Sequence, residues 1–479
     1  MTGIVSYGAY IPRYRMSRKT ITAAMGWYGS AGVPGEKAVA NYDEDSVTMA
    51  VAAGMNCLNG ADAGSLEALY LATVNAPYKE RQDAGIVAGA LDLGVKVRTA
   101  DFTDSTKAGT AALVAGCEAV KSGSVKRMLV CAADCRMGKP GSFEEANYGD
   151  GAAALLLGDS NVIASFMGSF SVTYDFMDRW RTEDDKFVHS SEDRWIRDEG
   201  YTKFINEAIK GLLVKYELDP KNIAKVVYPC LYPREHAAIG KSAGFAPDQI
   251  QQELLSTVGD CGTAHPLMML VAALEDAKPG DRIIVASYGH GSDALFFDVT
   301  EEITKLKAGN GVKAGLEARA DLVSYEKYLS FRNILPLEKG IRGETGPTQV
   351  PVLWRDRREI LALYGSKCKK CNTPQYPSQR ICVKPDCGAV DQMEPYRFAD
   401  KKGRLFSYTG DSLAFSVSPP EMYGVIDFEG GGRYILDVTD SDPESLAVDM
   451  PVEMTFRRRY VDEVRGIYAY FWKAIPVKA

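Results

Sequence analysis

The same order of secondary-structure elements occurs twice in this sequence, and this repetition restricts the fold more than any other feature. In the first copy, Gly109–Ala112 begins a helix and a strand starting at Arg127 follows it. In the second copy, Gly262–Ala264 begins a helix and a strand starting at Arg282 follows it. Each copy then continues with a glycine turn and a further apolar strand. This repetition predicts a duplicated α/β unit.

The stretch 104–120 is the centre of the first copy. Small and polar residues open it, and a helix rich in Ala, Leu and Val follows. Asp104, Ser105 and Thr106 are expected to cap that helix, so that its free amide hydrogens and positive dipole end face a pocket. The amides at the two helix starts, together with the glycine turns Gly149–Gly151 and Gly289–Gly291, can supply oxyanion donors.

The composition is that of a large globular protein. With 479 residues, 46% hydrophobic and 25% charged, the chain has room for two or three domains and a large core. A net charge of -7 argues against a nucleic-acid-binding protein. No window is long and apolar enough to span a membrane, and residues 1–10 lack a signal-peptide pattern. Scattered cysteines that read as reduced, with no export signal, favour a cytoplasmic location.

Four of the ten cysteines form a cluster near the C-terminus. The pair Cys368 and Cys371 is followed by the pair Cys382 and Cys387, with a short loop between the pairs. Two thiolate pairs at this spacing predict a closed, tetrahedral Zn2+ site with no open position for a substrate. The zinc is expected to be structural, because a lobe this small needs a cross-link such as a metal ion to stabilise its fold.

Five short strands are expected beyond the cysteines, between residues 403 and 472. Their alternation and the Gly, Pro and Asp residues between them predict a small β-barrel of the OB type. The basic triplet Arg457–Arg459 has three possible uses in such a barrel: contact with nucleic acid, with a CoA phosphate, or with a partner domain. The acidic balance of the whole chain disfavours the first.

A charged segment, residues 175–200, lies between the two copies and is rich in Asp, Arg and Trp. Its composition is typical of solvated surface. Its position between the repeats also permits a second role, as a cap over a ligand entrance.

Residues 1–300 resemble the bacterial and archaeal 3-hydroxy-3-methylglutaryl-CoA synthases of the thiolase superfamily. Residues from about 322 onward resemble the zinc-ribbon and OB-fold modules that accompany thiolase-like enzymes as acyl-CoA-handling partners. The motifs of the first resemblance are Tyr42–Asp45, Lys107–Ala112, Gly149–Ala153 and Ala277–Ile283.

This resemblance implies an α/β chain with a duplicated thiolase-type five-layer fold, followed by a small zinc ribbon and an OB-fold β-barrel. It also implies coenzyme A thioesters as substrates, and either a homodimer or a hetero-oligomer with a thiolase-type subunit. Neither nucleic acid nor membrane is an expected partner. The expected domains are a thiolase-like domain at 1–320, a helical linker at 321–365, the zinc ribbon at 366–392 and the OB barrel at 393–479.

The catalytic positions of the family are substituted. The family places its acyl-accepting cysteine immediately before Lys-Ala-Gly-Thr, where this chain has Thr106. The family glutamate falls near Val74 and Asn75, the histidine near Pro229, and the asparagine at Asp260. A threonine hydroxyl is a far weaker nucleophile than a thiolate. Ordinary condensation through an acyl-cysteine is therefore not expected.

Other polar residues near these positions are candidates for the site. Each has a competing structural role as a helix cap or as a hydrogen-bonded core group, and Cys261 is expected to be an inert thiol. The catalytic candidates are His265, Asp260, Thr106 and Tyr228. The substrate-binding candidates are Asn75, Ser105, Gly149, Gly289 and His290.

Two functions compete on this basis. The first is an acyltransferase-like or aldolase-like enzyme that makes or cleaves a carbon–carbon bond next to a CoA thioester, by condensation, thiolysis or retro-aldol chemistry. The second is a non-catalytic acyl-CoA-binding or scaffold subunit that partners an active thiolase. Turnover by the chain alone would distinguish them.

Overall fold

The computed structural model describes residues 1–25, 34–306, 311–339 and 348–477. It divides into two compact units. The first unit comprises 1–40, 45–88 and 93–325, and the second comprises 41–44, 89–92 and 326–479. Residues 340–347, inside the segment expected to be a linker, lie outside the described residues.

A nine-stranded sheet runs through the first unit in the order β11-β12-β13-β8-β1-β7-β6-β4-β5. The strand β7 is buried along its whole length, as expected for a strand covered on both faces. The strands are β1 (Gly3–Tyr10), β4 (Ala68–Ala72), β5 (Arg98–Phe102), β6 (Arg127–Asp134), β7 (Gly151–Gly158), β8 (Ala164–Thr173), β11 (Lys225–Val227), β12 (Arg282–Tyr288) and β13 (Gly291–Val299).

The sheet contains the same arrangement twice. In the run β4-β6-β7-β1, the first pair is parallel and the next two pairs are antiparallel. The run β11-β12-β13-β8 repeats that pattern pair by pair. The predicted duplication is therefore confirmed at the level of strand order and direction.

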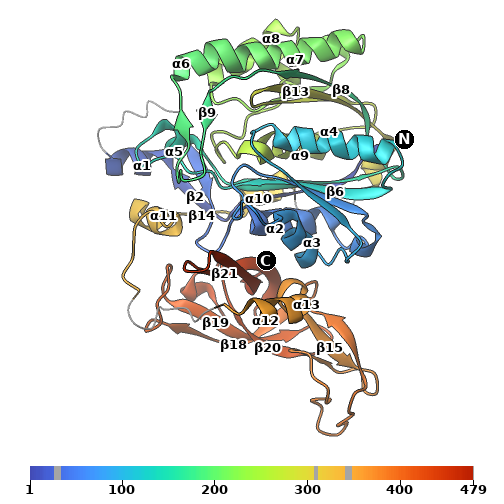
Figure 1. Cartoon of the computed structure of the whole chain (residues 1–479), viewed down its shortest axis with the longest axis vertical. Helices are drawn as coiled ribbons and strands as arrows, with labels where there is room; N and C mark the ends of the chain where they lie inside the picture. The colour runs from blue at the N-terminus through green and yellow to red at the C-terminus, as the bar shows by residue number, and fades with distance from the viewer. Residues whose placement is uncertain (26–33, 307–310, 340–347, 478–479) are drawn as a thin grey trace. The chain divides into compact units, whose positions relative to one another are not determined.

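Helices complete the five layers (Figure 1). Two central helices lie between the two halves of the sheet, and the remaining long helices cover the outer faces. The central helices are α4 (Ala108–Lys121) and α9 (His265–Asp276). The outer helices are α2 (Ser46–Leu58) and α3 (Asp83–Ala90) on the first half, and α7 (Thr202–Lys215) and α8 (Pro233–Ser242) on the second. The predicted five-layer fold is confirmed.

The charged insertion is folded rather than irregular. It contains the short strands β9 (Arg179–Trp180) and β10 (His189–Ser190), which pair antiparallel. The helix α6 (Asp193–Trp195) and a turn of π-helix (Ile196–Tyr201) then lead into α7. The side chain of Glu192 caps α6 by accepting the Arg194 and Trp195 amides.

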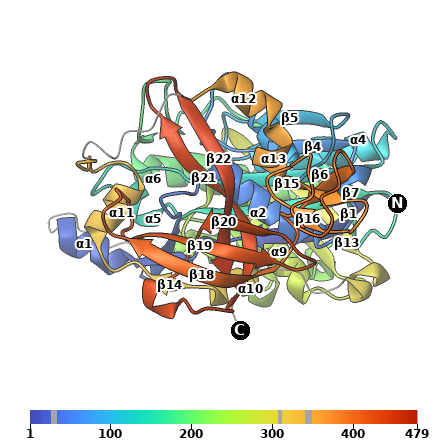
Figure 2. The ribbon, with the colours of Figure 1, turned by 90° about the horizontal axis from the view of Figure 1, so that it is seen from below.

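Two sheets form most of the second unit. A three-stranded sheet in the order β16-β15-β17 carries the cysteine segment, and a five-stranded sheet in the order β20-β19-β18-β21-β22 forms the barrel. Figure 2 shows β18 and β19 side by side and the long β21–β22 hairpin. Their bounds are β15 (Tyr364–Cys368), β16 (Pro374–Gln375), β17 (Met393–Arg397), β18 (Gly403–Asp411), β19 (Glu421–Phe428), β20 (Arg433–Asp437), β21 (Pro451–Asp462) and β22 (Ile467–Pro476).

All five expected barrel strands are present, but β21 extends further than the sequence pattern indicated. It runs to Asp462 and so includes the basic triplet. Arg457 is buried, and its guanidinium pairs with Asp440 at 2.5 Å. The triplet is therefore not one continuous exposed basic patch, because its first member is neutralised inside the unit.

Candidate active site

The start of α4 faces the glycine turn that precedes β13. Thr106 Oγ1 donates to the Tyr288 carbonyl at 2.7 Å, and Ser105 Oγ donates to the Gly289 carbonyl at 2.9 Å. Lys107 is the N-cap residue, and no side chain caps the helix there. The expected capping by Asp104, Ser105 and Thr106 is therefore wrong. The two hydroxyls bond across to the turn, and Ser105 Oγ also accepts the amide of the N-cap residue Lys107 at 3.3 Å without reaching the first helical turn.

Gly289 has no room for a side chain. A Cβ atom there would lie 2.5 Å from Ser105 Oγ and 2.6 Å from Thr106 Oγ1, closer than any normal carbon–oxygen contact. The next residue, His290, has a left-handed backbone (φ 50°), and its carbonyl accepts the Tyr174 amide at 3.2 Å. The turn is therefore shaped to bring backbone against the start of α4.

The start of the second central helix is held by the other glycine turn. The Gly149 amide donates to the Asp260 carbonyl at 3.1 Å, and the Asp260 amide donates to the Asn147 carbonyl at 2.8 Å. A Cβ atom at Gly149 would collide with the Val258 carbonyl. Each helix start is thus fixed by the glycine turn of the opposite copy.

Asp260 forms a buried ion pair. Its Oδ2 lies 3.0 Å from Arg136 Nη1, and its Oδ1 accepts the Gly262 amide at 3.0 Å. The Arg136 guanidinium also donates to the Tyr148 hydroxyl at 2.8 Å and stacks over that ring at 3.9 Å. Burial alone would raise the pKa of Asp260, but the charges of Arg136 and His265 outweigh it and lower that pKa. Asp260 is therefore ionised and a weak base at neutral pH.

His265 opens α9 and is only 2% exposed. Its Nδ1 accepts the Cys261 amide at 3.1 Å, so the neutral ring carries its proton on Nε2. Nε2 lies 3.6 Å from Glu253 Oε2, and Nδ1 lies 3.8 Å from Asp260 Oδ1. Burial acts to lower the pKa of His265, whereas Glu253 and Asp260 act to raise it, and the net effect is upward.

Glu253 lies between two imidazoles. Its Oε1 accepts the Cys230 amide, and His236 Nε2 lies 3.7 Å from the same oxygen. Burial lowers the pKa of His236. The hydroxyl of Tyr228 donates to the His236 carbonyl at 2.6 Å, so this candidate holds the start of α8 in place. Two of the four histidines of the chain thus flank one carboxylate.

Asp134 joins the first copy to the start of the second central helix. Its Oδ1 accepts Thr73 Oγ1 and the Val74 amide, both at 2.9 Å. Its Oδ2 accepts the amide and the hydroxyl of Thr263, at 2.7 and 2.9 Å. Burial raises the pKa of Asp134 despite these bonds. The candidate Asn75 lies beside this network, and its amide donates to Thr73 Oγ1 at 3.0 Å.

Cys261 is a buried thiol between Asp260 and the short helix that precedes α9. Burial raises its pKa well above the ordinary value, with Asp150 and Asp260 adding to the effect. A thiol that resists ionisation is a poor nucleophile. This agrees with the expectation that Cys261 is inert.

The main partners of the candidate site residues were not predicted from the sequence. Asp134 ends the strand β6 and Arg136 follows it, and polar residues at the carboxyl end of a buried strand are a usable signal. Glu253 stands in a polar stretch with no motif, so nothing in the local pattern marked it. Its role depends on contacts with residues far away in the sequence.

The charged insertion contacts segments of this site. The Val188 amide donates to the Met137 carbonyl at 3.0 Å, and Arg181 Nη2 donates to the Val74 carbonyl at 3.0 Å. Arg179 Nε lies 3.6 Å from Glu144 Oε1. These contacts lie next to Arg136 and at the position where the family glutamate was expected, which favours the cap over a purely solvated surface.

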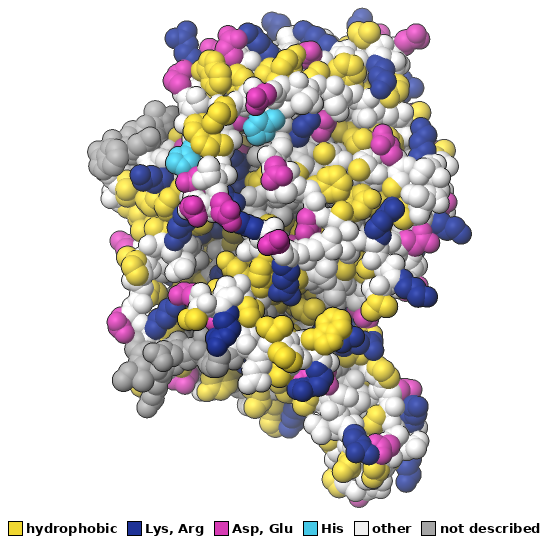
Figure 3. Space-filling model, in the orientation of Figure 1, with side chains coloured by type: hydrophobic (Ala, Val, Ile, Leu, Met, Phe, Trp, Pro, Cys, Tyr) yellow, Lys and Arg dark blue, Asp and Glu magenta, His cyan; other side chains and the backbone are white. Residues whose placement is uncertain are grey.

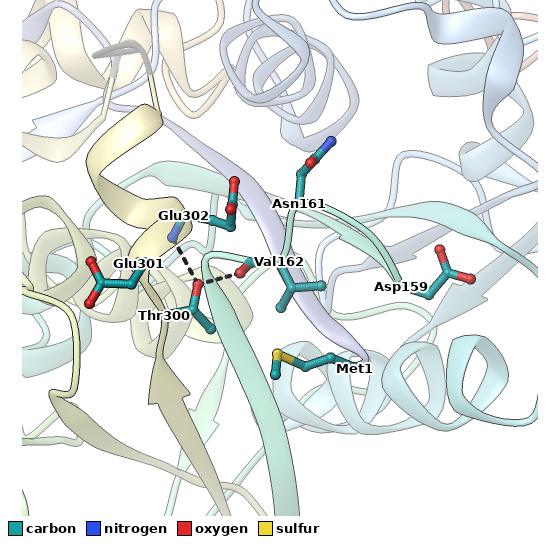
Figure 4. A pocket seen from close by; sticks show the side chains of 7 residues that line it. All are labelled: Met1, Asp159, Asn161, Val162, Thr300, Glu301 and Glu302. Atoms are coloured by element: carbon teal, nitrogen blue, oxygen red, sulfur yellow. Dashed lines mark hydrogen bonds between the residues drawn. The ribbon is translucent and has the colours of Figure 1, made fainter.

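A surface hollow of about 370 Å³ lies elsewhere on the first unit (Figure 4). The residues that line it gather where β7 and β13 end, whereas the glycine turns precede those strands. No candidate site residue lines this hollow. It is lined by Met1, Asp159, Asn161, Val162, Thr300, Glu301 and Glu302.

The four clustered cysteines meet in the second unit. Their sulfur atoms all lie within 4.8 Å of one another. Cys368 Sγ lies 3.8 Å from Cys387 Sγ, and Cys371 Sγ lies 3.4 Å from Cys382 Sγ. Tetrahedral zinc with bonds of about 2.3 Å requires sulfur separations close to these. The donor set therefore fits a four-thiolate zinc site.

Charges of both signs are interspersed on the face seen in Figure 3, rather than gathered into one basic field. Within the part of the chain that the structure describes, no helix combines the length and apolar character needed to cross a bilayer.

Comparisons with known proteins match each part of the chain. The family model "ChsH2, C-terminal OB-fold domain" matches residues 396–457. The hydroxymethylglutaryl-CoA synthase of Methanopyrus kandleri is 35% identical over 314 residues, covering 64% of this chain and 89% of that protein. The enzyme of the same name from Methanocaldococcus jannaschii is 33% identical over 341 residues, covering 69% of this chain and 99% of that protein.

Solved structures share the fold at lower identity. A structure of MvaS in complex with 3-hydroxy-3-methylglutaryl coenzyme A matches with a TM-score of 0.60 and 20% identity, covering 70% of this chain and 92% of that chain. The 3-oxoacyl-[acyl-carrier-protein] synthase III of Aquifex aeolicus matches with a TM-score of 0.56 and 18% identity, covering 62% of this chain and 100% of that chain. These neighbours establish the thiolase-type fold.

Proposed function

Because this chain belongs to the hydroxymethylglutaryl-CoA synthase family, we propose that it binds a CoA thioester and makes or cleaves a carbon–carbon bond beside the thioester carbonyl without a cysteine nucleophile. Its relatives are named as enzymes of HMG-CoA, and a neighbour of the same fold was solved with CoA. The reaction proceeds by acid–base chemistry, with no acyl group passing to the protein.

One observation carries this proposal: at the second helix start a buried imidazole lies between two carboxylates, whereas the titratable groups at the first start, Lys107 and Asp293, form an ion pair at 3.3 Å. At the first start, the Thr106 hydroxyl donates to the Tyr288 carbonyl, and among the described residues it has no hydrogen bond to a side-chain base that could activate it as a nucleophile. At the second start, His265 lies within 4 Å of both Glu253 and Asp260. An imidazole between carboxylates is suited to moving protons.

The backbone supplies the remaining requirement. Forming an enolate next to a thioester places negative charge on the thioester oxygen, which needs positioned hydrogen-bond donors. The Gly149 and Gly289 amides already donate to the carbonyls of Asp260 and Gly291. The donors would therefore be other amides at the two helix starts and glycine turns, and such donors need no particular side chain. They are therefore unaffected by the substituted family positions.

Turnover assays test the proposal. The purified chain is incubated with acetyl-CoA plus a panel of acceptors, and separately with 3-hydroxyacyl-CoA compounds, and products are identified by mass spectrometry. His265→Ala is expected to lower turnover about 100-fold or more, as loss of an acid–base group does. Asp260→Asn is expected to lower turnover as well, because it removes the charge that pairs with Arg136 and lies 3.8 Å from His265 Nδ1. Thr106→Val is expected to leave turnover within about threefold. Full activity in both His265→Ala and Asp260→Asn would refute the assignment.

A non-catalytic acyl-CoA-binding subunit is the second candidate. The observation that favours it is the Arg136–Asp260 pair, in which each charge at the helix start is already neutralised. In that case the purified chain has no turnover and restores or enhances that of a separate thiolase-type subunit. Activity of the chain alone excludes this candidate.

Zinc is proposed for the four-cysteine site of the second unit. The four thiolates would hold the ion in a closed shell, so it would stabilise the fold and take no part in the reaction. Elemental analysis is expected to give about one zinc per chain. Cys382→Ser is expected to lower that content, and an unchanged content would contradict the site.

A further inference from the structure

We propose that Glu253 and His265 together bind the hydroxyl group of a 3-hydroxyacyl thioester, with Glu253 accepting the hydroxyl hydrogen and His265 donating to the hydroxyl oxygen. This inference rests on the proposed function and names its substrate class. It assigns a direct role to Glu253, which no sequence motif marked.

The two atoms involved are buried and unpartnered. Neither His265 Nε2 nor Glu253 Oε2 has a hydrogen-bond partner among the described residues. They face each other at 3.6 Å, too far for a normal hydrogen bond and close enough for one oxygen to reach both. A buried donor and acceptor without partners are unfavourable, so a ligand that satisfies both gains affinity.

The direction of each hydrogen bond is fixed by the surroundings. Because His265 Nδ1 accepts the Cys261 amide, the proton of the neutral ring is on Nε2 and points toward Glu253. The other oxygen of Glu253 is taken by the Cys230 amide and faces His236. One donor and one acceptor therefore remain on the His265 side of Glu253, while His236 Nε2 is unpartnered on the other side.

Only some chemical groups match this pair. A hydroxyl donates once and accepts, so it satisfies both atoms. A ketone oxygen accepts from His265 and leaves Glu253 unpaired, and a methylene group satisfies neither. The site is therefore expected to rank 3-hydroxyacyl above 3-oxoacyl thioesters, and both above unsubstituted acyl thioesters.

The same contacts describe a balanced cleavage step. Glu253 takes the hydroxyl proton as the C3–O bond becomes a carbonyl and the C2–C3 bond breaks. The electron pair of the broken bond forms the enolate of the thioester. C2 then takes a proton, which gives a shortened acyl thioester and a free carbonyl compound without any oxidant or reductant. Condensation is the reverse of this step.

Other titratable groups lie on both sides of the pair. Asp260 and Arg136 face His265 from the side of the helix start, while His236, Cys230 and Tyr201 lie on the Glu253 side. The Asp260 and Arg136 charges neutralise each other, so Glu253 remains the base available to a ligand.

Binding of three matched thioesters tests the inference on the full-length chain. The probes are 3-hydroxybutyryl-CoA, acetoacetyl-CoA and butyryl-CoA, measured by isothermal titration calorimetry. Wild type is expected to bind the hydroxy compound about tenfold or more tighter than butyryl-CoA, since hydrogen bonds to a charged group are worth about 1.5–3 kcal/mol. The oxo compound is expected to lie between them.

Two variants and one control locate the effect. Glu253→Gln, which preserves shape, and His265→Leu are each expected to reduce the hydroxy preference below about threefold while butyryl-CoA affinity stays within about twofold. Unchanged butyryl-CoA binding also shows that each variant is folded. Glu301→Gln, on the distant hollow of Figure 4, is expected to keep the wild-type preference.

The outcomes separate this inference from the proposed function. If all three thioesters bind wild type equally, or if the preference survives Glu253→Gln, the hydroxyl assignment is overturned and CoA-thioester binding stands. If none of them binds, the proposed function fails and this inference fails with it. The hydroxyl assignment would also be overturned if wild type bound a second metal ion that Glu253→Gln loses. His265 Nε2 and Glu253 Oε2 would then be ligands of that ion.

Discussion

At the start of α4, side-chain hydroxyls bond to the opposite glycine turn, whereas at the start of α9 backbone amides and carbonyls do so. Ser105 and Thr106 are therefore occupied in the first copy. In the second copy Asp260 and His265 keep their side chains for Arg136 and Glu253. The two starts thus meet the opposite turn through different groups. The first also carries the Lys107–Asp293 ion pair at 3.3 Å, and the second places an imidazole between two carboxylates.

This contrast shows that residue type is constrained at the two glycine turns and is variable at the two helix starts. Close backbone approach demands glycine at both turns, because a Cβ atom collides at Gly149 and at Gly289. The side chains at the helix starts carry no such demand. The acid–base groups of the proposed reaction, His265 and Glu253, lie at the second start.

The largest expected effect concerns Asp134, the carboxylate that ties the copies together. Asp134→Ala leaves the Thr73 hydroxyl and the Val74 and Thr263 amides without their acceptor, while the Thr263 hydroxyl keeps the Ala72 carbonyl at 3.2 Å. Breaking a buried network of this kind costs about 3–5 kcal/mol of unfolding free energy, measured by urea denaturation. Asp159→Ala, at the surface hollow, is the matched control and should change stability by less than about 0.5 kcal/mol. A loss below about 1 kcal/mol for Asp134→Ala would show that the helix starts are held independently.

The second prediction tests whether charge holds the start of α9. Arg136→Met leaves Asp260 partly buried without its cation, and is expected to lower the unfolding free energy by about 2–4 kcal/mol. The double variant Arg136→Met/Asp260→Asn removes both charges and is expected to recover at least about half of that loss. A double-mutant cycle by chemical denaturation measures the coupling. Additive losses would mean that the pair contributes packing alone.

The repeated elements were readable from the sequence because they depend on local patterns. Short apolar runs, glycine turns and helix signals recur in order, and they predicted the layered fold and the barrel strands. The start of α2 is local in the same way, since Asp45 caps it through a capping box with Thr48, three residues further along the chain. The same reasoning failed at Ser105 and Thr106, since tertiary bonds to Tyr288 and Gly289 replaced the local cap.

The candidate site was only partly readable for a related reason. His265 and Asp260 stand next to a recognisable helix start, so the pattern singled them out. Their partners Arg136 and Glu253 come from segments that only the folded chain brings near. Resemblance identified which family groups were substituted, but it held no information on which residues now surround those positions.

The third prediction tests the tight contact at the first start. Gly289→Ala places a methyl group against Ser105 and Thr106, and is expected to cost about 1–3 kcal/mol, as overpacking does. Gly85→Ala in α3, where a Cβ atom meets nothing closer than 3.9 Å, is the matched control and is expected to be neutral or stabilising. Thermal unfolding of both variants measures the difference. Equal stability of the two variants would show that the turn shifts to accommodate the methyl group without loss of stability.

The smallest expected effect is a pH dependence confined to the second start. The pKa of His265 is raised above its unfolded value of 6.5, chiefly because Glu253 and Asp260 outweigh the opposing effect of burial. A raised pKa means that the folded state binds the proton more tightly, so this stabilisation is complete below pH 6.5 and is lost as the pH rises through the folded-state pKa. The gap in unfolding free energy between wild type and His265→Asn should therefore narrow by about 1 kcal/mol as the pH rises from 6 to 9. Urea denaturation at several pH values measures the gap. A constant gap would mean that the Cys261 amide keeps the ring neutral in the folded protein throughout, and that His265 acts only as a hydrogen-bond donor through Nε2.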